Sequence, residues 1–297
     1  SPLAVGGLTH GVYNIELTAA YASIANGGVY TEPILYTKIY DHDGNVLLDN
    51  EKQESHRVLK ETTAYMLTDM MRDVISRGTG GQAGISGMNV AGKTGTTNDT
   101  IDLTFYGYTP YYTGGIWMGY DTQKEIKAAG NAHLKIWKSV MSDIHRHEGL
   151  ANKNFEKPDG LTSITYCSAT GEAPTELCGQ DYYGKTTHSD LATVEFGGPK
   201  GTCSLHQTYV VCKESGKIAA PTCPADCHMQ IVLAVNDDKI LGKPSEIPEG
   251  KMDVLVNEVC DTQHAPVADP IDPNMPGEPG MNENTDTGYT EENFGIQ

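Results

Sequence analysis

Three stretches within the first 150 residues repeat apolar side chains at the three- and four-residue intervals of a helix. These stretches predict helices over residues 15–25, over the residues that follow a cap at Thr62 or Thr63, and over residues 132–146. Asn14 is the expected N-cap of the first helix. The side chains expected to face inward are Leu17, Ala20, Tyr21 and Ile24, then Met66, Leu67, Met70, Met71, Val74 and Ile75, then Leu134, Trp137, Val140, Met141 and Ile144.

Alternating or continuous apolar runs between these stretches are typical of β-strands. The predicted strands are residues 34–40, 46–48, 89–94, 104–108 and 113–120. The turn His42-Asp43-Gly44-Asn45 joins the first two strands, and Thr109-Pro110 joins the last two. Helices, hairpin-linked strands and a covering helix indicate the α+β class, an antiparallel sheet with helices packed on it.

The pattern changes after residue 150. Short β-type runs stand among Gly, Pro and Cys, at residues 210–211, 230–235 and 252–256. All seven cysteines fall in this region, and the spacing C-x3-G-x6-C occurs twice, starting at Cys167 and at Cys212. We therefore predict a small Cys-containing β-rich module over 153–260. Residues 261–297 are rich in Pro, Gly, Asn, Asp and Glu, which predicts a disordered acidic tail.

Charge narrows the range of partners. The chain has 21 basic and 39 acidic residues and a net charge of −18, and residues 151–297 alone carry 23 acidic and 9 basic residues. Such a chain is a poor partner for nucleic acid, because the phosphate backbone repels it. The chain has no run of 18 apolar residues, so we predict no membrane-spanning helix within it. The opening Ser1-Pro2-Leu3 has neither an initiator Met nor a signal peptide, so we expect the chain to be a fragment.

The run AGKTGTT in the predicted strand 89–94 and just after it carries the candidate chemistry. Side chains alternate along a strand, so Lys93 and Gly95 are expected to point away from Thr94 and Thr96. Gly95 lets a ligand backbone approach, and an open strand edge pairs with a peptide as an added strand. Lys93 offers a proton-relay or carboxylate-steering group, and Thr96 or Thr97 offers a hydroxyl for a carboxylate. The backbone N–H after Gly95 is placed to stabilise an oxyanion.

K-T-G is one motif of the β-lactamases and penicillin-binding proteins, but three letters alone are weak. The surroundings are more specific: AGKTGTTND, then FYGYTP, then GGIWMGYD, and upstream LTAAYASIANGG and a hairpin ending in D-x-x-G-x-V-L. In this order, over residues 1–147, the chain resembles the end of the transpeptidase domain of class A (bifunctional) penicillin-binding proteins. One departure is Thr104, where that family commonly has an aromatic residue. The later Cys-containing region resembles, more loosely, the C-terminal extension of Gram-positive members.

The resemblance implies a serine acyltransferase of the cell wall. Such an enzyme attacks the D-Ala-D-Ala end of a peptidoglycan stem peptide, forms an acyl-enzyme and passes the acyl group to an amine, and β-lactams acylate the same serine. Residues 1–150 would be the C-terminal half of this domain, in the serine β-lactamase-like fold, on the extracytoplasmic face of the bacterial membrane. Lys93 would be catalytic, and the residues that bind the substrate would be Thr94, Gly95, Thr96 and Thr97, with Thr96 and Thr97 on its carboxylate. No cofactor is implied.

The nucleophile of such an enzyme is not in this sequence. No lysine has a serine three residues before it, so the motif S-x-x-K is absent, and S-x-N is absent too. We expect both motifs and the membrane anchor to lie upstream, and the isolated chain to be inactive. Two alternatives stay open: a carboxypeptidase or β-lactamase with the same strand, and a non-catalytic wall-binding module of the same fold.

The cysteines leave three alternatives. They form disulfides, remain free thiols or bind zinc, and zinc ligands would come from Cys203, His206, Cys212, Cys223, Cys227 and His228. The resemblance places the chain outside the cytoplasm, where disulfides persist. We therefore favour disulfides, with Cys167–Cys178 and Cys212–Cys223 as the simplest pairs, and expect no metal site.

Overall fold

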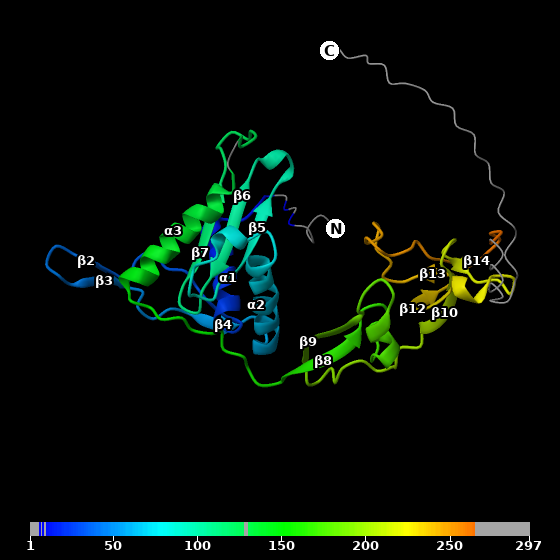
Figure 1. The fold of residues 1–297 in the computed structure, drawn as a ribbon. Coiled ribbons are helices and arrows are strands. Elements are labelled where there is room, and N and C mark those ends of the chain that lie inside the picture. The colour runs from blue at the N-terminus through cyan, green and yellow to red at the C-terminus, as the bar shows by residue number, and fades with distance from the viewer. Residues whose placement is uncertain (1–5, 7, 9, 128–129, 265–297) are drawn as a thin grey trace, which may run out of the picture. The chain divides into compact units, whose positions relative to one another are not determined.

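The computed structural model describes residues 6, 8, 10–127 and 130–264. The chain divides into two compact units (Figure 1). The first comprises the chain up to Thr175 together with Thr187–Cys203, and the second comprises Glu176–Thr186 and the chain from Ser204 onward. The domain boundaries predicted from sequence stay predictions, and the expected tail lies outside the described residues from residue 265 onward. None of the described helices is long and apolar enough to cross a lipid bilayer.

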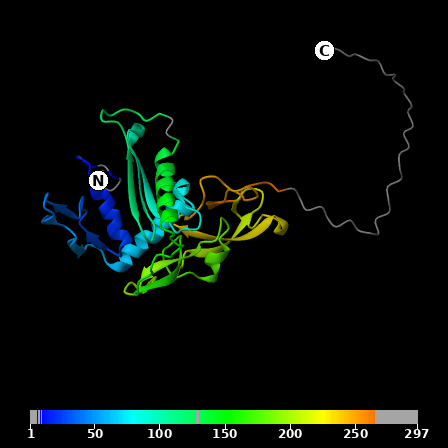
Figure 2. The same ribbon diagram turned by 90° about the vertical axis from the view of Figure 1, so that its left-hand side faces the viewer.

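The first unit is built on a three-stranded antiparallel sheet in the order β5-β6-β7. Helices α1 and α2 lie on one face of this sheet and α3 lies on the other (Figures 1 and 2). The bounds are β5 Ala91–Thr96, β6 Leu103–Tyr108, β7 Thr113–Met118, α1 Asn14–Ala25, α2 Glu61–Ser76 and α3 Ala132–His147, with short 3-10 helices η2 Gly81–Ala83 and η3 Asn98–Thr100. This arrangement confirms the α+β prediction.

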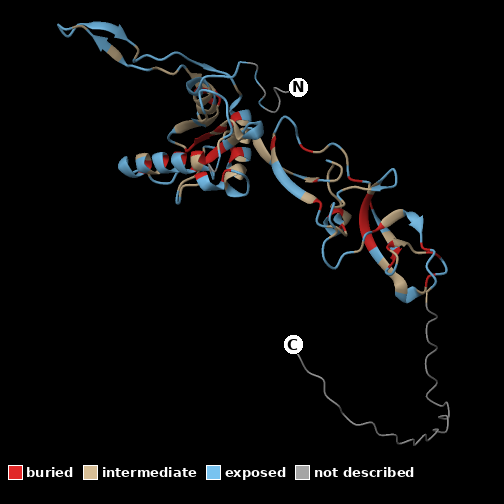
Figure 3. Ribbon diagram, turned by 90° about the horizontal axis from the view of Figure 1, so that it is seen from above, coloured by how far each residue is buried: buried red, intermediate tan, exposed pale blue. Residues whose placement is uncertain are grey.

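Alternation along β6 explains the two layers of helices. Phe105 packs edge-on against Trp137 of α3, with ring centroids 5.1 Å apart. Tyr106 points the opposite way and stacks on Tyr21 of α1 at 5.3 Å. Tyr108, on the same face as Tyr106, is hydrogen-bonded to Thr68 of α2. The buried residues accordingly concentrate on the sheet and on the inward sides of the helices (Figure 3).

Some details of the predicted helices are wrong. Helix α1 is capped by Tyr13, whose backbone N–H donates to the Glu16 carboxylate at 3.1 Å, and Asn14 is already helical. Helix α2 begins at Glu61, and its N-cap is Lys60, two residues before Thr62, the nearer of the two predicted caps. Met70 and Val140 are 57% and 51% exposed, although both were expected to face inward. Each lies at the margin of an apolar stripe, where sequence spacing does not fix the width of the buried face.

The remaining strands of the first unit form three small antiparallel ribbons. Their bounds are β1 Val29–Thr31 paired with β4 Ser55–Arg57, β2 Lys38–Tyr40 paired with β3 Val46–Asp49, and β8 Leu161–Cys167 paired with β9 Thr187–Thr193. The predicted hairpin is confirmed, but its first strand is shorter than residues 34–40. The pair β8–β9 was not predicted, because polar residues interrupt its apolar positions.

The second unit is a five-stranded sheet in the order β13-β12-β10-β11-β14. The bounds are β10 His206–Cys212, β11 Lys217–Ile218, β12 His228–Asn236, β13 Lys239–Ile240 and β14 Leu255–Val259, with 3-10 helices η4 Glu176–Gln180 and η5 Ala225–Cys227. Its apolar core consists of Val211, Ile231, Leu233 and Val254. The predicted strands at 210–211 and 230–235 are confirmed, whereas the third begins at Leu255 rather than at Met252.

Candidate functional site on strand β5

Strand β5, which carries the Lys-Thr-Gly run, lies at an edge of its sheet. Among the described residues it pairs only with β6, which leaves its other side unpaired. In the register, Lys93 lies opposite Tyr106 and Thr94 lies opposite Phe105. Directly opposed residues of two strands share one face of the sheet. Lys93 therefore lies on the α1 and α2 face and Thr94 on the α3 face, as the predicted alternation requires.

The ammonium group of Lys93 is held close to the backbone of its own strand. Lys93 is exposed, and its Nζ donates a hydrogen bond of 2.8 Å to the carbonyl oxygen of Thr94. The Thr97 backbone N–H donates to the Asp102 carbonyl across from it, so the backbone groups of Thr97 and Gly95 face β6 and those of Thr94 and Thr96 face away from it. The positive charge thus lies beside the open edge of β5.

The Thr94 hydroxyl ties β5 to the glycine-rich loop that follows α2. Its Oγ1 lies 2.7 Å from Oγ1 of Thr79. Thr79 lies in the turn between the end of α2 at Ser76 and the start of η2 at Gly81, so this bond ties the strand to the loop between the two helices. Sequence reasoning did not single out Thr79, because a lone threonine in a glycine-rich loop carries no recognisable pattern.

Gly95 is in close contact with strand β6. A Cβ atom placed on Gly95 would lie 2.3 Å from Oγ1 of Thr104, its partner in the register. Real Cβ atoms do not approach another atom so closely, so a larger residue here requires Thr104 to move. The absence of a side chain at Gly95 therefore permits close packing against Thr104 of β6. It also lets a ligand approach the backbone of β5 closely.

Thr97 closes the turn between β5 and β6. Its hydroxyl donates to the Asp102 carboxylate at 3.1 Å and accepts the Asp102 backbone N–H at 2.8 Å. The other carboxylate oxygen of Asp102 accepts the indole N–H of Trp117 at 2.9 Å. The sequence did not indicate that Asp102 joins Thr97 to Trp117, because five- and fifteen-residue separations are not periodic signals. Thr96, in contrast, is exposed at the end of β5.

Tyrosines beneath Lys93 supply no base at neutral pH. Burial raises the pKa of Tyr106, which lies opposite Lys93 in the register. Burial, followed by the neighbouring Tyr106, raises the pKa of Tyr21, which stacks on that ring. Both phenols therefore remain protonated in physiological conditions. Lys93 is the residue on this face of β5 with the chemistry of proton transfer.

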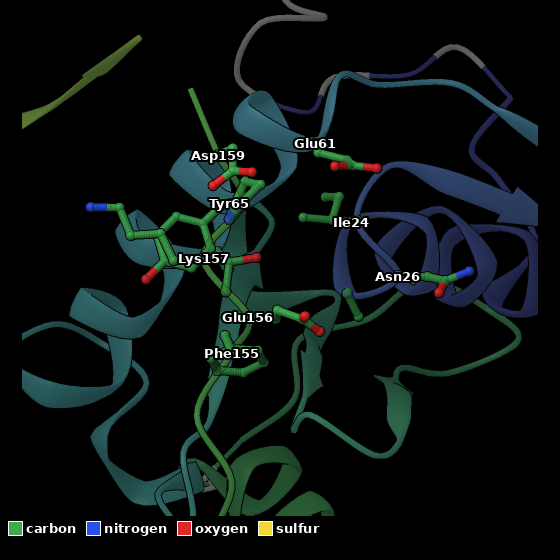
Figure 4. A pocket seen from close by; sticks show the side chains of 12 residues that line it. Ile24, Asn26, Glu61, Tyr65, Phe155, Glu156, Lys157 and Asp159 are labelled. Carbon is green, nitrogen blue, oxygen red and sulfur yellow. The ribbon is translucent and has the colours of Figure 1, made fainter. Parts of the chain in front are cut away.

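A cavity of about 600 Å³ lies elsewhere in the first unit, where the end of α1 and the start of α2 meet residues 155–159 (Figure 4). The side chains of Glu61, Tyr65 and Asp159 are among those that line it. None of the residues 93–97 lines this cavity. The predicted site residues instead lie along the exposed end and edge of β5.

Comparison with known proteins agrees with the geometry. Residues 4–144 match the family of the penicillin-binding protein transpeptidase domain. Penicillin-binding protein 1A of Clostridium perfringens is 35% identical over 191 residues, which cover 64% of this chain and 23% of that protein. Penicillin-binding protein 1A of Clostridium botulinum is 32% identical over 225 residues, which cover 75% of this chain and 27% of that protein. The chain thus spans about a quarter of the length of the curated relatives it matches.

A solved structure supports the fold. Penicillin-binding protein 1A from Haemophilus influenzae aligns with 65% of this chain and 33% of its own, with a TM-score of 0.51 and 17% sequence identity. At this identity the likeness concerns the fold alone. It agrees with an antiparallel sheet covered by helices on both faces.

Proposed function

The chain belongs, through residues 4–144, to the penicillin-binding protein transpeptidase family, and we propose that it forms one wall of a peptidoglycan D,D-transpeptidase active site. The observation that carries the proposal is the open edge of β5 with the Lys93 ammonium beside it. In this proposal the substrate is the D-Ala-D-Ala end of a stem peptide, and β-lactams occupy the same place. The protein would act on the extracytoplasmic face of the bacterial membrane.

The open edge of β5 suits an extended peptide. A stem peptide that lies alongside β5 pairs with backbone groups that β6 does not use. Backbone groups alternate in direction along a strand, so the N–H and C=O of Thr96 face the same side as the carbonyl of Thr94. The Thr96 N–H is therefore the donor that we assign to the oxyanion of the tetrahedral intermediate.

Lys93 and Thr96 are the groups that we assign to the charged parts of the substrate. Lys93 attracts the terminal carboxylate and assists proton transfer between the nucleophile and the leaving amine. The Thr96 hydroxyl is exposed and donates to that carboxylate. Thr97 donates its only hydroxyl proton to Asp102. It therefore donates to a substrate carboxylate only after its hydrogen bond to Asp102 breaks.

The serine that forms the acyl-enzyme comes from outside the 297 residues, because no S-x-x-K occurs in them. The bond from the serine oxygen to the penultimate D-Ala carbonyl forms as the terminal D-Ala leaves, and an amine of a neighbouring stem then takes the acyl group. The residues of β5 bind and orient the peptide during both steps. The alternative function is a module that binds the cell wall without catalysing acyl transfer, and the experiment must distinguish the two.

Labelling with a fluorescent penicillin tests the proposal. The protein expressed from the complete reading frame should form a covalent fluorescent band, and the 297-residue chain alone should form none. Lys93→Ala should reduce the rate of labelling strongly, whereas Lys138→Ala, an exposed lysine on α3, should label at the parental rate.

Each result has a clear meaning. A band on the 297-residue chain alone would place a nucleophile within it and overturn the assigned division of the site. Equal labelling of the Lys93→Ala and Lys138→Ala proteins would overturn the role of β5. No label on the complete protein, with binding to purified peptidoglycan retained, would favour the non-catalytic wall-binding module.

A further inference from the structure

Three thiols and one imidazole converge at one end of the second unit. Cys212 ends β10, Cys223 lies in the turn before η5, Cys260 follows β14, and His264 comes four residues later. One ligand atom from each of the four lies within 4.8 Å of each of the others. The three cysteines are buried. Segments that are distant in the sequence thus meet at a single point through groups that ligate transition metals.

The spacing of these atoms fits a tetrahedral metal ion. Nε2 of His264 lies 3.7 Å from Sγ of Cys212 and 3.6 Å from Sγ of Cys260. A zinc ion binds thiolate sulfur at about 2.3 Å and imidazole nitrogen at about 2.0–2.1 Å, so tetrahedral geometry places S and N about 3.6 Å apart. The donors already stand at the separation that a shared ion requires.

The other nitrogen of His264 has the partner expected of a metal ligand. Nδ1 lies 3.0 Å from the Glu214 carboxylate. Imidazoles that bind metal through one nitrogen almost always donate the N–H of the other nitrogen to a carboxylate, a carbonyl or water, which fixes the tautomer and the ring orientation. Glu214 therefore directs the Nε2 lone pair toward the three sulfur atoms.

We propose that Cys212, Cys223, Cys260 and His264 bind a structural zinc ion. Four protein ligands leave no open position, which is typical of structural rather than catalytic zinc. The ion would join the end of β10 to the segment that follows β14, around a sheet whose buried apolar core consists of Val211, Ile231, Leu233 and Val254. In so small a core, metal binding contributes directly to the free energy of folding.

A disulfide is the competing arrangement for the same sulfur atoms. Cys212 and Cys223 carry free thiols, so the disulfide expected between them from their spacing is not formed in the structure. Cys227 lies on the other side of the imidazole, with its Sγ 3.5 Å from Nδ1 of His264 and 3.5 Å from Glu214. We therefore place Cys227 beside the site and outside the ligand set.

The matched pair Cys260→Ser and Cys227→Ser tests the proposal in the complete 297-residue chain. Each protein is purified with a thiol reductant, loaded with Zn²⁺, desalted and analysed for zinc per chain. Cys260→Ser should retain about one zinc equivalent fewer than the parent, and Cys227→Ser should retain the parental amount. Loading with Co²⁺ should give the visible bands of tetrahedral thiolate-bound cobalt, with lower intensity in Cys260→Ser.

Several outcomes would overturn the proposal. Equal zinc content in the parent, Cys260→Ser and Cys227→Ser would rule out the site. Loss of zinc in Cys227→Ser with retention in His264→Gln would replace the assigned ligands by four cysteines. Iron in place of zinc in the parent as isolated would overturn the metal assignment. Because Cys260 is buried, its substitution changes packing as well as the ligand set. His264→Gln keeps all three cysteines and should also lose zinc.

Thiol alkylation provides a measurement that needs no variant. Protein isolated from its native compartment is denatured without reductant, treated with a chelator and alkylated. Modification of Cys212, Cys223 and Cys260 would show the reduced thiols that the zinc site requires, and a Cys212–Cys223 disulfide peptide would exclude the site. None of these results depends on penicillin labelling, so the zinc site and the transpeptidase assignment can fail separately.

Discussion

The hydroxyl of Thr97 and the carboxylate of Asp102 hold each other across the turn between β5 and β6. Thr97 Oγ1 donates to Asp102 at 3.1 Å, and the Asp102 backbone N–H donates back to that oxygen at 2.8 Å. The hydroxyl that sequence reasoning assigned to a substrate carboxylate thus serves the turn in the structure. Thr96, one residue earlier, is exposed and free of this constraint.

Thr96→Val and Thr97→Val should therefore have different effects on penicillin acylation in the complete protein. A hydrogen bond to a charged group contributes roughly 1.5–3 kcal/mol, so Thr96→Val should slow acylation roughly 10-fold to 100-fold. Thr97→Val should slow it less and lower the thermal stability instead. Time courses of fluorescent penicillin labelling measure the acylation rate, and thermal denaturation measures the stability. A larger loss of acylation in Thr97→Val would mean that the bond to Asp102 exchanges for substrate.

Gly95→Ala should destabilise the first unit through contact with Thr104. The added Cβ would lie 2.3 Å from Thr104 Oγ1, and overpacking of this kind costs roughly 1–3 kcal/mol. The double variant Gly95→Ala/Thr104→Ala removes the hydroxyl and should recover most of the loss. Chemical denaturation of the single and double variants measures the coupling. Additive losses would show that Thr104 is not the obstacle.

Thr68 and Tyr108 should be strongly coupled, because both are buried and share one hydrogen bond between α2 and the sheet. Thr68 Oγ1 donates to the Ala64 carbonyl at 2.9 Å, so Tyr108 donates to Thr68 at 2.8 Å. Thr68→Val leaves the Tyr108 hydroxyl without an acceptor and should cost roughly 1–3 kcal/mol of unfolding free energy. Adding Tyr108→Phe should recover part of this loss. Chemical denaturation of the two single variants and the double variant measures the coupling, and the prediction fails if the double variant is no more stable than Thr68→Val alone.

His133 should make the first unit less stable in mild acid. Its buried Nδ1 has no hydrogen-bond partner within the described part of the chain, and burial lowers the pKa of the imidazole below the ordinary 6.5. The unfolded chain then takes up a proton at a higher pH than the folded chain does. The unfolding free energy should therefore decrease as pH falls through about 6.5 and level off below the folded pKa.

Comparison of two leucine substitutions checks this pH dependence. His133→Leu should flatten the decrease in unfolding free energy between neutral pH and pH 5. His42→Leu should leave it unchanged, because the His42 side chain is 89% exposed. Denaturant titrations across this pH range provide the measurement. The same slope in the parent and in His133→Leu would assign the acid sensitivity to another group.

Local patterns were sufficient for the three helices, the β2–β3 hairpin and the central sheet of the first unit, but not for β1, β4, β8 and β9. Helical spacing located α1, α2 and α3, and the strand-turn pattern located β5, β6 and β7, because each depends on neighbours within a few residues. The alternation of Lys93 and Thr94 also follows from strand geometry alone. Family resemblance added the reaction class, which residue spacing does not determine.

The sequence by itself therefore determined the α+β class, the Lys-Thr-Gly strand and the absence of S-x-x-K from these residues. Only the tertiary structure decided which face of the sheet each helix covers, that Thr97 is bound to Asp102, and that Cys212, Cys223 and Cys260 meet His264. These relationships join residues through the packing of separate elements. No local periodicity records such contacts, and the same cysteine spacing is compatible with a disulfide or a metal site until the chain is folded.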